Sequence, residues 1–258
     1  MKKNGFKIRL AGLALGVLVL LPGCIQKGTD PMNEYLYPDT VYTYKTDVEE
    51  STLTTGLSLT YLLLANKQNP LSQSYSPGTV VTLSTSIANR SGILLESRTA
   101  DALYAMMAEM RADGIIDIAV TSGYRDYSYQ QRLYEGYIEQ EMATGLSREE
   151  AVKKVETYSA PPGYSEHQTG FVVDFITSTM TGLDESFEES AAFAWLSRNC
   201  YRFGFILRYP KAEDKVAITG YTYEPWHYRF VGREAATEIM KRGITLEEFL
   251  SMEFQKSK

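Results

Sequence analysis

Hydrophobic residues begin the chain as one unbroken run and later recur at helical or strand-like spacing. The run covers residues 10–21 and follows residues 1–9, which carry four basic residues and no acidic one. A basic segment before a short apolar run is typical of a secretory signal peptide, and twelve residues are too few to span a bilayer. We expect residues 1–23 to be a signal peptide, the alternatives being a buried helix or an uncleaved anchor.

The apolar run ends in Leu21-Pro22-Gly23-Cys24, which resembles a bacterial lipobox. In that motif the cysteine is lipidated and becomes the first residue of the mature chain. The resemblance implies lipidation at Cys24, with acyl chains that anchor the exported protein stably to the membrane. Residues 25–51 are polar and lack sustained periodicity. We therefore expect 24–51 to be a tether, with at most a short strand around Val41–Tyr44.

Beyond residue 51 the pattern predicts one compact domain, residues 52–258, with several helices. Apolar residues within Thr99–Asp113 recur every three or four positions, which is typical of a helix with one buried face. Ser147 and Glu150 have the spacing of a capping box at the start of another helix. Further helical patterns cover Ser128–Thr144, Glu188–Cys200 and Glu234–Arg242, and Leu246–Phe249 forms one more turn.

Short runs of β-branched and aromatic residues predict strands at Ile115–Thr121, Phe171–Phe175, Gly204–Arg208 and Tyr221–Tyr228. Helices and strands are interspersed without regular alternation, and the sequence contains no glycine-rich phosphate loop. This organisation favours an α+β fold, a single domain with a mainly antiparallel sheet flanked by helices, over a doubly wound parallel fold.

Composition excludes several classes of protein. The chain of 258 residues is 44% hydrophobic and 22% charged, which is a globular composition. Its net charge is −6, and without residues 1–23 it has 22 basic and 32 acidic residues, or −10. We expect no nucleic-acid partner, because phosphate binding needs a basic surface. The two cysteines, Cys24 and Cys200, cannot form a disulfide scaffold, and we expect Cys200 to be a buried small residue.

The chain has only two histidines, His167 and His227, so any histidine chemistry must use them. Asp174 follows His167 by seven residues and lies within an apolar run. On a regular strand an odd separation places two residues on opposite faces, but Gly170 permits a kink that lets them converge. Burying a carboxylate in such a run costs free energy unless the carboxylate is paired with a positive charge or bound to a metal.

The second histidine ends the segment Glu224-Pro225-Trp226-His227. Pro225 disfavours a helical conformation for Glu224, which predicts a bend that brings Glu224 and His227 towards one cavity. Two imidazoles and one carboxylate with an open fourth position are the pattern of a catalytic zinc site. Glu224 remains as a general base for the attacking water. For each histidine alone, the alternative is a hydrogen-bonded core residue.

The pattern Ser165-x-His167-x-x-Gly170-x-x-x-Asp174, followed by Glu224-x-Trp226-His227, resembles the VanY/VanX family of zinc carboxypeptidases and dipeptidases. These enzymes act on bacterial cell-wall peptides. The wider segments 121–125 and 224–229 are most similar to VanY-type and LdcB-type carboxypeptidases, and the resemblance runs from about Leu57 to Gly232. It implies a small α+β domain, hedgehog- or D,D-peptidase-like, with an antiparallel sheet beneath a Zn²⁺ ion.

The resemblance implies roles for the metal-site residues. His167, Asp174 and His227 match the zinc ligands, and Glu224 matches the catalytic base.

It also implies substrate contacts. Arg125 matches an arginine that stabilises the oxyanion and holds the substrate, and Ser165 matches a serine that binds the terminal carboxylate. Gln131 matches a glutamine near the substrate pocket. Without the motif, Arg125 would be an ordinary surface arginine paired with Asp126 or Glu135.

The implied activity is removal of the C-terminal D-alanine from peptidoglycan stem peptides. The enzyme would be an exported, lipid-anchored monomer that faces the cell wall. An L,D-carboxypeptidase acting on the tetrapeptide is favoured over a D,D-carboxypeptidase acting on the pentapeptide, from the overall character of residues 162–175 and 224–232. The alternatives are an endopeptidase that cuts within cross-links and a non-catalytic wall-binding lipoprotein.

Overall fold

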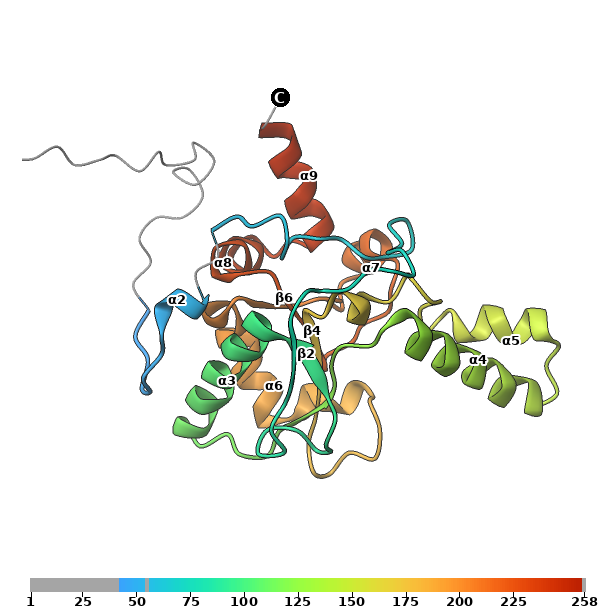
Figure 1. Ribbon diagram of the computed structural model, residues 1–258, viewed down its shortest axis with the longest axis horizontal. Helices are drawn as coiled ribbons and strands as arrows, with labels where there is room; N and C mark the ends of the chain where they lie inside the picture. Colours follow the sequence, from blue (N-terminus) through green and yellow to red (C-terminus); the bar gives the residue numbers. More distant parts are fainter. Residues whose placement is uncertain (1–41, 54–55, 257–258) are drawn as a thin grey trace, which may run out of the picture.

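The structure is a computed structural model in which residues 42–53 and 56–256 are described, and element labels are those of Figure 1. The expected signal peptide, 1–23, and the expected lipidation site, Cys24, lie outside these residues, so both stay predictions. Within the described residues, no helix combines the length and the apolar character needed to cross a membrane.

Helices and short strands are interspersed along the described chain. The α-helices are α2 (Glu50–Leu53), α3 (Ser97–Ala112), α4 (Tyr127–Ala143), α5 (Arg148–Val155), α6 (Ala191–Asn199), α7 (Glu213–Thr219), α8 (Arg233–Arg242) and α9 (Leu246–Lys256). The strands are β1 (Val80–Thr82), β2 (Leu94–Glu96), β3 (Ala119–Ser122), β4 (Val172–Ile176), β5 (Phe205–Leu207) and β6 (His227–Phe230). Short 3₁₀ helices are η1 (Glu166–Thr169), η2 (Glu185–Glu189) and η3 (Cys200–Phe203).

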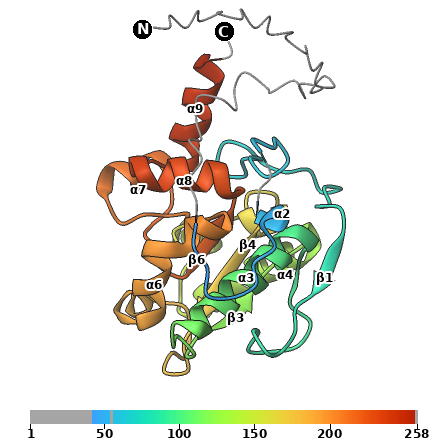
Figure 2. The same cartoon turned by 90° about the vertical axis from the view of Figure 1, so that its left-hand side faces the viewer.

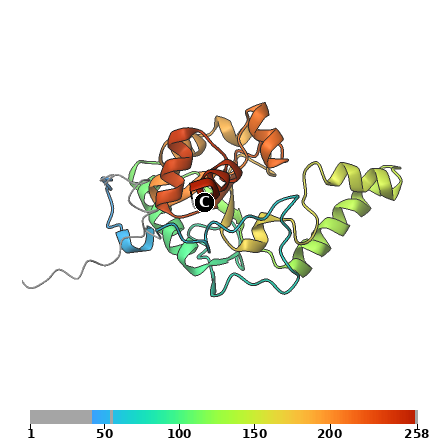
Figure 3. The ribbon, with the colours of Figure 1, turned by 90° about the horizontal axis from the view of Figure 1, so that it is seen from above.

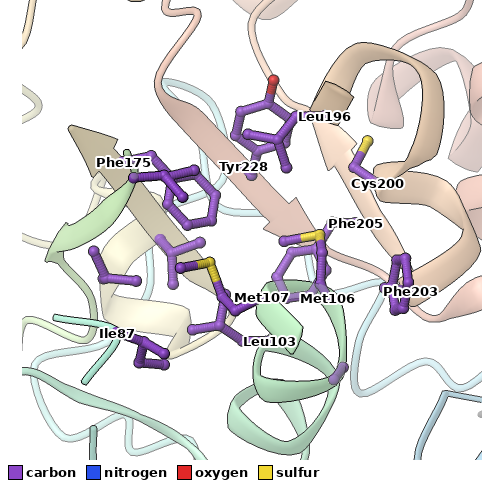
Figure 4. Packing of buried hydrophobic residues seen from close by; sticks show 14 of the residues in the cluster. Ile87, Leu103, Met106, Met107, Phe175, Leu196, Cys200, Phe203, Phe205 and Tyr228 are labelled. Carbon is purple, nitrogen blue, oxygen red and sulfur yellow. The ribbon is translucent and has the colours of Figure 1, made fainter. Parts of the chain in front are cut away.

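The centre of the domain is a four-stranded antiparallel sheet with the strand order β3-β4-β6-β5. Apolar side chains of this sheet and of helices α3 and α6 form the main core. Figure 4 shows Leu103, Met106 and Met107 of α3 packed near Phe175 of β4 and Tyr228 of β6. The predicted α+β architecture with a mainly antiparallel sheet is confirmed.

Alternation along β4 and β6 separates an apolar face of the sheet from a polar one. Phe175 belongs to the main core, so its neighbour Asp174 lies on the opposite face. Tyr228 also belongs to the core, and its neighbours His227 and Arg229 therefore share the face of Asp174. The register pairs Asp174 directly with His227, which places charged side chains together away from α3.

Helices α4 and α5 form a hairpin that projects from the rest of the domain (Figures 1 and 3). The hairpin has a small core of its own, to which Tyr134 and Ile138 contribute. Asp126 caps α4, and Ser147 and Glu150 form the capping box predicted for α5. The hairpin therefore carries its own local stabilisation.

The C-terminal helices α8 and α9 pack on a second apolar cluster, which includes Ile206 of β5, Ile239 of α8 and Phe249 of α9. Figure 2 shows α9 extending from the domain beyond α8. Because Phe249 shares this cluster with Ile206 of β5, the start of α9 lies close to the sheet.

Residues 42–53, most of which the sequence assigned to the tether, contact the domain. The Tyr44 hydroxyl donates to the Arg202 carbonyl over 3.0 Å, and Glu109 accepts from the backbone N–H groups of Lys45 and Thr46. These bonds attach the segment to α3 and η3.

Two predicted strands begin several residues later in the chain than expected, and the first of them is β3. The strand expected at Ile115–Thr121 begins only at Ala119. Gly114 has φ +82° just after α3, and Asp117 accepts from the Ser178 N–H, so the first residues of the expected strand form a loop.

Other differences have equally local causes. Of the expected strand Tyr221–Tyr228 only the last two residues lie in β6, because Pro225 occupies a turn. The turn expected at Leu246–Phe249 is the start of the longer helix α9. Residues 42–44 form no strand, and β1, β2 and α7 were not predicted.

Candidate metal centre and catalytic cavity

A cavity of about 400 Å³ contains most of the predicted site residues. Its polar wall includes Arg125, Ser165, Glu166, His167, Asp174, Glu224 and His227. Its apolar and aromatic wall includes Leu133, Tyr137, Tyr158, Leu183, Tyr209, Tyr221 and Trp226. The first three residues of this second wall belong to the α4–α5 hairpin and the segment after it.

His167, Asp174 and His227 bring one ligand atom each into a single cluster. The three atoms lie within 4.8 Å of one another, and all three residues are buried. Asp174 Oδ2 lies 3.1 Å from His167 Nε2, and Asp174 Oδ1 lies 3.0 Å from His227 Nδ1. Asp174 Oδ1 makes no hydrogen bond of good geometry. A buried carboxylate with an unsatisfied oxygen between two imidazoles is a donor set that fits Zn²⁺.

The local charges favour a cation at this cluster. Burial raises the pKa of Asp174, but the effect of His167 and His227 is opposite and larger. The pKa of Asp174 is therefore far below its usual range. Burial lowers the pKa of His227, whereas the neighbouring carboxylates of Asp174 and Glu166 raise it, to about 9. The carboxylates thus stabilise positive charge beside them.

Each imidazole is oriented by a contact of its second nitrogen. His167 Nδ1 lies 2.7 Å from the Gly123 carbonyl oxygen, to which it donates, so Nε2 is left for a metal. His227 is turned the other way, with Nε2 3.4 Å from Glu166 Oε2 and Nδ1 facing Asp174. The two histidines therefore offer different ring nitrogens.

The convergence of His167 and Asp174 depends on Gly170. His167 lies in the 3₁₀ helix η1, which Gly170 ends with φ +79° before β4 begins. A Cβ at Gly170 would lie 2.8 Å from Pro77 carbon atoms. The predicted kink is confirmed, and only glycine fits it without strain.

Glu224 enters the cavity from a turn. The Glu224 carbonyl accepts from the His227 N–H over 3.1 Å with Pro225 at the second position, as in a β-turn. Glu224 Oε2 lies 3.5 Å from His227 Nδ1. Burial, the largest effect, raises the pKa of Glu224 to about 7. This carboxyl group can therefore exchange protons near neutral pH.

Arg125 follows β3 and precedes α4. Its Nη2 donates to Ser165 Oγ over 3.4 Å and its Nη1 donates to Ser122 Oγ over 3.3 Å. The surface pairing considered for Arg125 is not found: Asp126 caps α4 and Glu135 binds Arg148. Among the described residues Arg125 has no ion-pair partner, so its charge is available to a ligand.

Gln131, unlike the other residues predicted for the catalytic site, lies outside the cavity. Gln131 is exposed on α4 and does not line the cavity, whereas its neighbour Gln130 is buried and donates to the Ala160 carbonyl over 2.7 Å. The structure therefore does not bring Gln131 to the site.

Sequence analysis missed several residues of the cavity. Tyr137 and Tyr158 line it and pack edge to face, with ring centroids 5.6 Å apart. The spacing of Leu133 and Tyr137 on one helix face was the available signal. Glu166 was also missed, although it directly precedes His167. Burial raises the pKa of Glu166, but Arg208 and Arg229 lower it far below the usual range.

Comparisons with known proteins agree with this site. The family model described as "VanY: D-alanyl-D-alanine carboxypeptidase" matches residues 92–233. Over 192 residues the chain is 41% identical to a D-alanyl-D-alanine carboxypeptidase of Enterococcus faecalis. The match covers 74% of this chain and 66% of that relative, slightly under two thirds of its length.

Solved structures that are similar to this chain include carboxypeptidases of the same kind. A VanY D,D-pentapeptidase from a VanB-type resistance cassette, in complex with Zn(II), is similar with a TM-score of 0.62 and 38% identity, over 74% of this chain and 99% of that one. The LdcB LD-carboxypeptidase is similar with a TM-score of 0.63 and 34% identity, over 73% of this chain and 84% of that one.

Proposed function

The chain belongs to the VanY family of D-alanyl-D-alanine carboxypeptidases, and we propose that it is a zinc-dependent carboxypeptidase of peptidoglycan stem peptides. The observation that carries the proposal is the convergence of a His-Asp-His cluster, a part-buried Glu224 and an Arg125 without an ion-pair partner on one cavity. The first two supply hydrolytic chemistry, and the third supplies recognition of a free carboxylate.

Zn²⁺ held by His167, Asp174 and His227 would polarise the scissile carbonyl and lower the pKa of the attacking water. Glu224 accepts the proton of that water and delivers it to the leaving amine. Its pKa of about 7 suits both transfers, because a group near neutrality gains and loses a proton readily.

Arg125 and Ser165 would bind the anionic part of the substrate. A guanidinium offers two parallel N–H donors, which match the two oxygens of a carboxylate or a developing oxyanion. Ser165 is buried beside Arg125 Nη2, so its hydroxyl can add a third bond. This pair favours substrates that end in a free carboxylate, such as a terminal D-alanine.

The finer proposal is an L,D-carboxypeptidase that trims the tetrapeptide. Its support is the character of residues 162–175 and 224–232 and the likeness to the LdcB LD-carboxypeptidase. A D,D-carboxypeptidase acting on the pentapeptide is the alternative, in keeping with the similar likeness to VanY.

Mass spectrometry of products from synthetic stem peptides tests both levels of the proposal. Zinc-loaded protein is incubated separately with the tetrapeptide, the pentapeptide and a C-terminally amidated form of each. Loss of one alanine from the tetrapeptide supports L,D cleavage, and loss only from the pentapeptide supports D,D cleavage. Cleavage of amidated peptides would indicate an endopeptidase, and no cleavage with zinc bound would indicate a non-catalytic wall-binding protein.

We also propose that the protein is exported and anchored through a lipidated Cys24, as a monomer on the cell-wall side of the membrane. The support is the signal-peptide pattern of residues 1–23 and the lipobox-like sequence before Cys24. Substitution Cys24→Ala should prevent labelling with a radioactive fatty acid and move the protein from the membrane fraction to the soluble fraction. Unchanged fractionation would contradict the anchor.

A further inference from the structure

The side chain of Glu166 is fully buried between the candidate metal centre and two arginines. Its Oε1 accepts from Arg208 Nε and from Arg229 Nη1, each over 2.7 Å. Its Oε2 lies 3.4 Å from His227 Nε2. Oε1 therefore fixes the carboxylate to the two arginines, and Oε2 faces the imidazole of His227.

The same network continues to the C-terminal helix α9. The Arg208 guanidinium donates through Nη1 and Nη2 to both oxygens of Glu247, over 2.9 and 2.6 Å. Asn66 Nδ2 donates to Glu247 Oε1 over 3.1 Å, which fixes the carboxylate from a second side. The family match ends at residue 233, so Glu247 lies beyond it.

We propose that Glu166 is a positioning residue for the metal ligand His227, and that Glu247 supports it by fixing Arg208. The inference rests on the proposed zinc site. A bond from His227 Nε2–H to Glu166 turns the ring so that Nδ1 points at the cluster, 3.0 Å from Asp174 Oδ1. A carboxylate acceptor also makes Nδ1 a better donor to a metal ion. Helix α9 is thereby a part of the metal centre, although it contributes no ligand.

A purely structural role is the competing account of Glu166. In that account Glu166 only neutralises Arg208 and Arg229, which are both fully buried. Arg229 has other partners, because its Nη2 donates to the carbonyls of Tyr61 and Leu63. The two accounts differ in whether the His227 ring responds when the charge of Glu166 is removed.

The test measures zinc affinity by chelator competition in full-length protein, for the wild type, E166Q, E247Q and E248Q. Glu248 is the matched control, because it lies next to Glu247 on α9 but pairs with Lys215. We expect E166Q to weaken zinc binding roughly 10- to 100-fold, the usual effect of removing such a partner. We expect E247Q to weaken it less, by roughly 3- to 10-fold, and E248Q to leave it unchanged.

Nitrogen-15 NMR of the zinc-loaded protein gives a second readout, and the chain has only two imidazoles. The ε2 proton of His227 should be visible and protected from exchange in the wild type. In E166Q its resonance should shift, because a neutral amide is a weaker acceptor. The δ1 proton of His167, bonded to the Gly123 carbonyl, should stay in place and serves as an internal control.

The outcomes separate this inference from the proposed function. A wild type that binds no zinc would overturn both. Tight zinc binding by the wild type, with unchanged affinity and an unchanged His227 resonance in E166Q, would overturn the role of Glu166 alone. If E166Q fails to fold, E247Q decides through the same two readouts, and wild-type behaviour of E247Q would overturn the proposal.

Discussion

Asp174 and His227 face each other directly across the antiparallel pair of β4 and β6, with Asp174 Oδ1 3.0 Å from His227 Nδ1. Directly opposed residues of neighbouring strands have closely spaced Cβ atoms. Two of the three candidate ligands are therefore held by the centre of the sheet, and only His167 lies outside it, in the 3₁₀ helix η1. This arrangement favours a metal site that persists when the metal leaves.

Metal removal should therefore inactivate the protein reversibly without unfolding it. Chelation should abolish peptide cleavage and lower the melting temperature, and added Zn²⁺ should restore both. A free zinc concentration about 100 times the Kd adds about 2.7 kcal/mol to the free energy of unfolding. For a domain of this size, that is a shift of roughly 5–10 °C in differential scanning calorimetry. A chelated protein with unchanged activity would contradict the prediction.

Glu224→Gln should separate metal binding from catalysis. The amide keeps the size of Glu224 but cannot carry a proton, so turnover should fall roughly 100- to 10,000-fold while zinc stoichiometry stays the same. Product formation is followed by mass spectrometry and bound zinc by atomic absorption. The exposed Glu213 provides the control, since Glu213→Gln should be fully active. Wild-type turnover of Glu224→Gln would exclude Glu224 as the base.

The local parts of the site could be predicted from the sequence, because their causes are local. The kink at Gly170 and the turn at Pro225 each follow from one residue's backbone preference. Asp174 within an apolar run, and Glu224 and His227 within an aromatic segment, indicated a common site. The direct pairing of Asp174 with His227 was not predictable, because register depends on how whole strands meet.

Two errors show where single-sequence reasoning failed. Glu166 contacts Arg208 and Arg229, which lie 42 and 63 residues further along the chain, so no local pattern indicated its role. Gln131 was one position away from the buried Gln130. One helical position rotates a side chain by about 100°, so the helix start at its cap Asp126 decides which glutamine faces inward.

Cys200 should be almost inert in the folded protein. Burial is the largest cause of its raised pKa of about 12, so only about one thiol in 10,000 is ionised at pH 8. In the unfolded chain, with a pKa of about 8.5, about a quarter is ionised. In protein that lacks residues 1–24, a thiol reagent at pH 8 should react only after guanidinium is added. Rapid labelling without denaturant would contradict the buried position.

Gly170→Ala should destabilise the fold and weaken zinc binding. The substitution forces a side chain into a left-handed conformation and against Pro77, at a cost of about 2 kcal/mol or more. Gly136 is the matched control, because it lies within α4 and a Cβ there would meet no atom within 4 Å. Gly136→Ala should stabilise the protein by about 0.5–1 kcal/mol. Urea unfolding of both variants, with zinc titration, checks the opposite signs.

Arg125→Lys should impair recognition of the terminal carboxylate more than folding. Lysine keeps the positive charge but loses the planar fork of donors that can reach a carboxylate and Ser165 together. Because a bond to a charged group contributes about 1.5–3 kcal/mol, kcat/KM should fall roughly 10- to 100-fold. The measurement compares kcat/KM for free-acid and amidated peptides, and the preference for the free acid should shrink in the variant.

The control for Arg125 is Arg132, which is exposed on α4 and lies over the Tyr129 ring. Arg132→Lys should keep wild-type kinetics, because Arg132 does not line the cavity. If Arg125→Lys lost activity equally towards both peptide forms, Arg125 would act on the oxyanion and not on the terminal carboxylate. A free-acid preference equal to that of the wild type would thus reassign carboxylate recognition to another group, of which Ser165 is the nearest polar candidate.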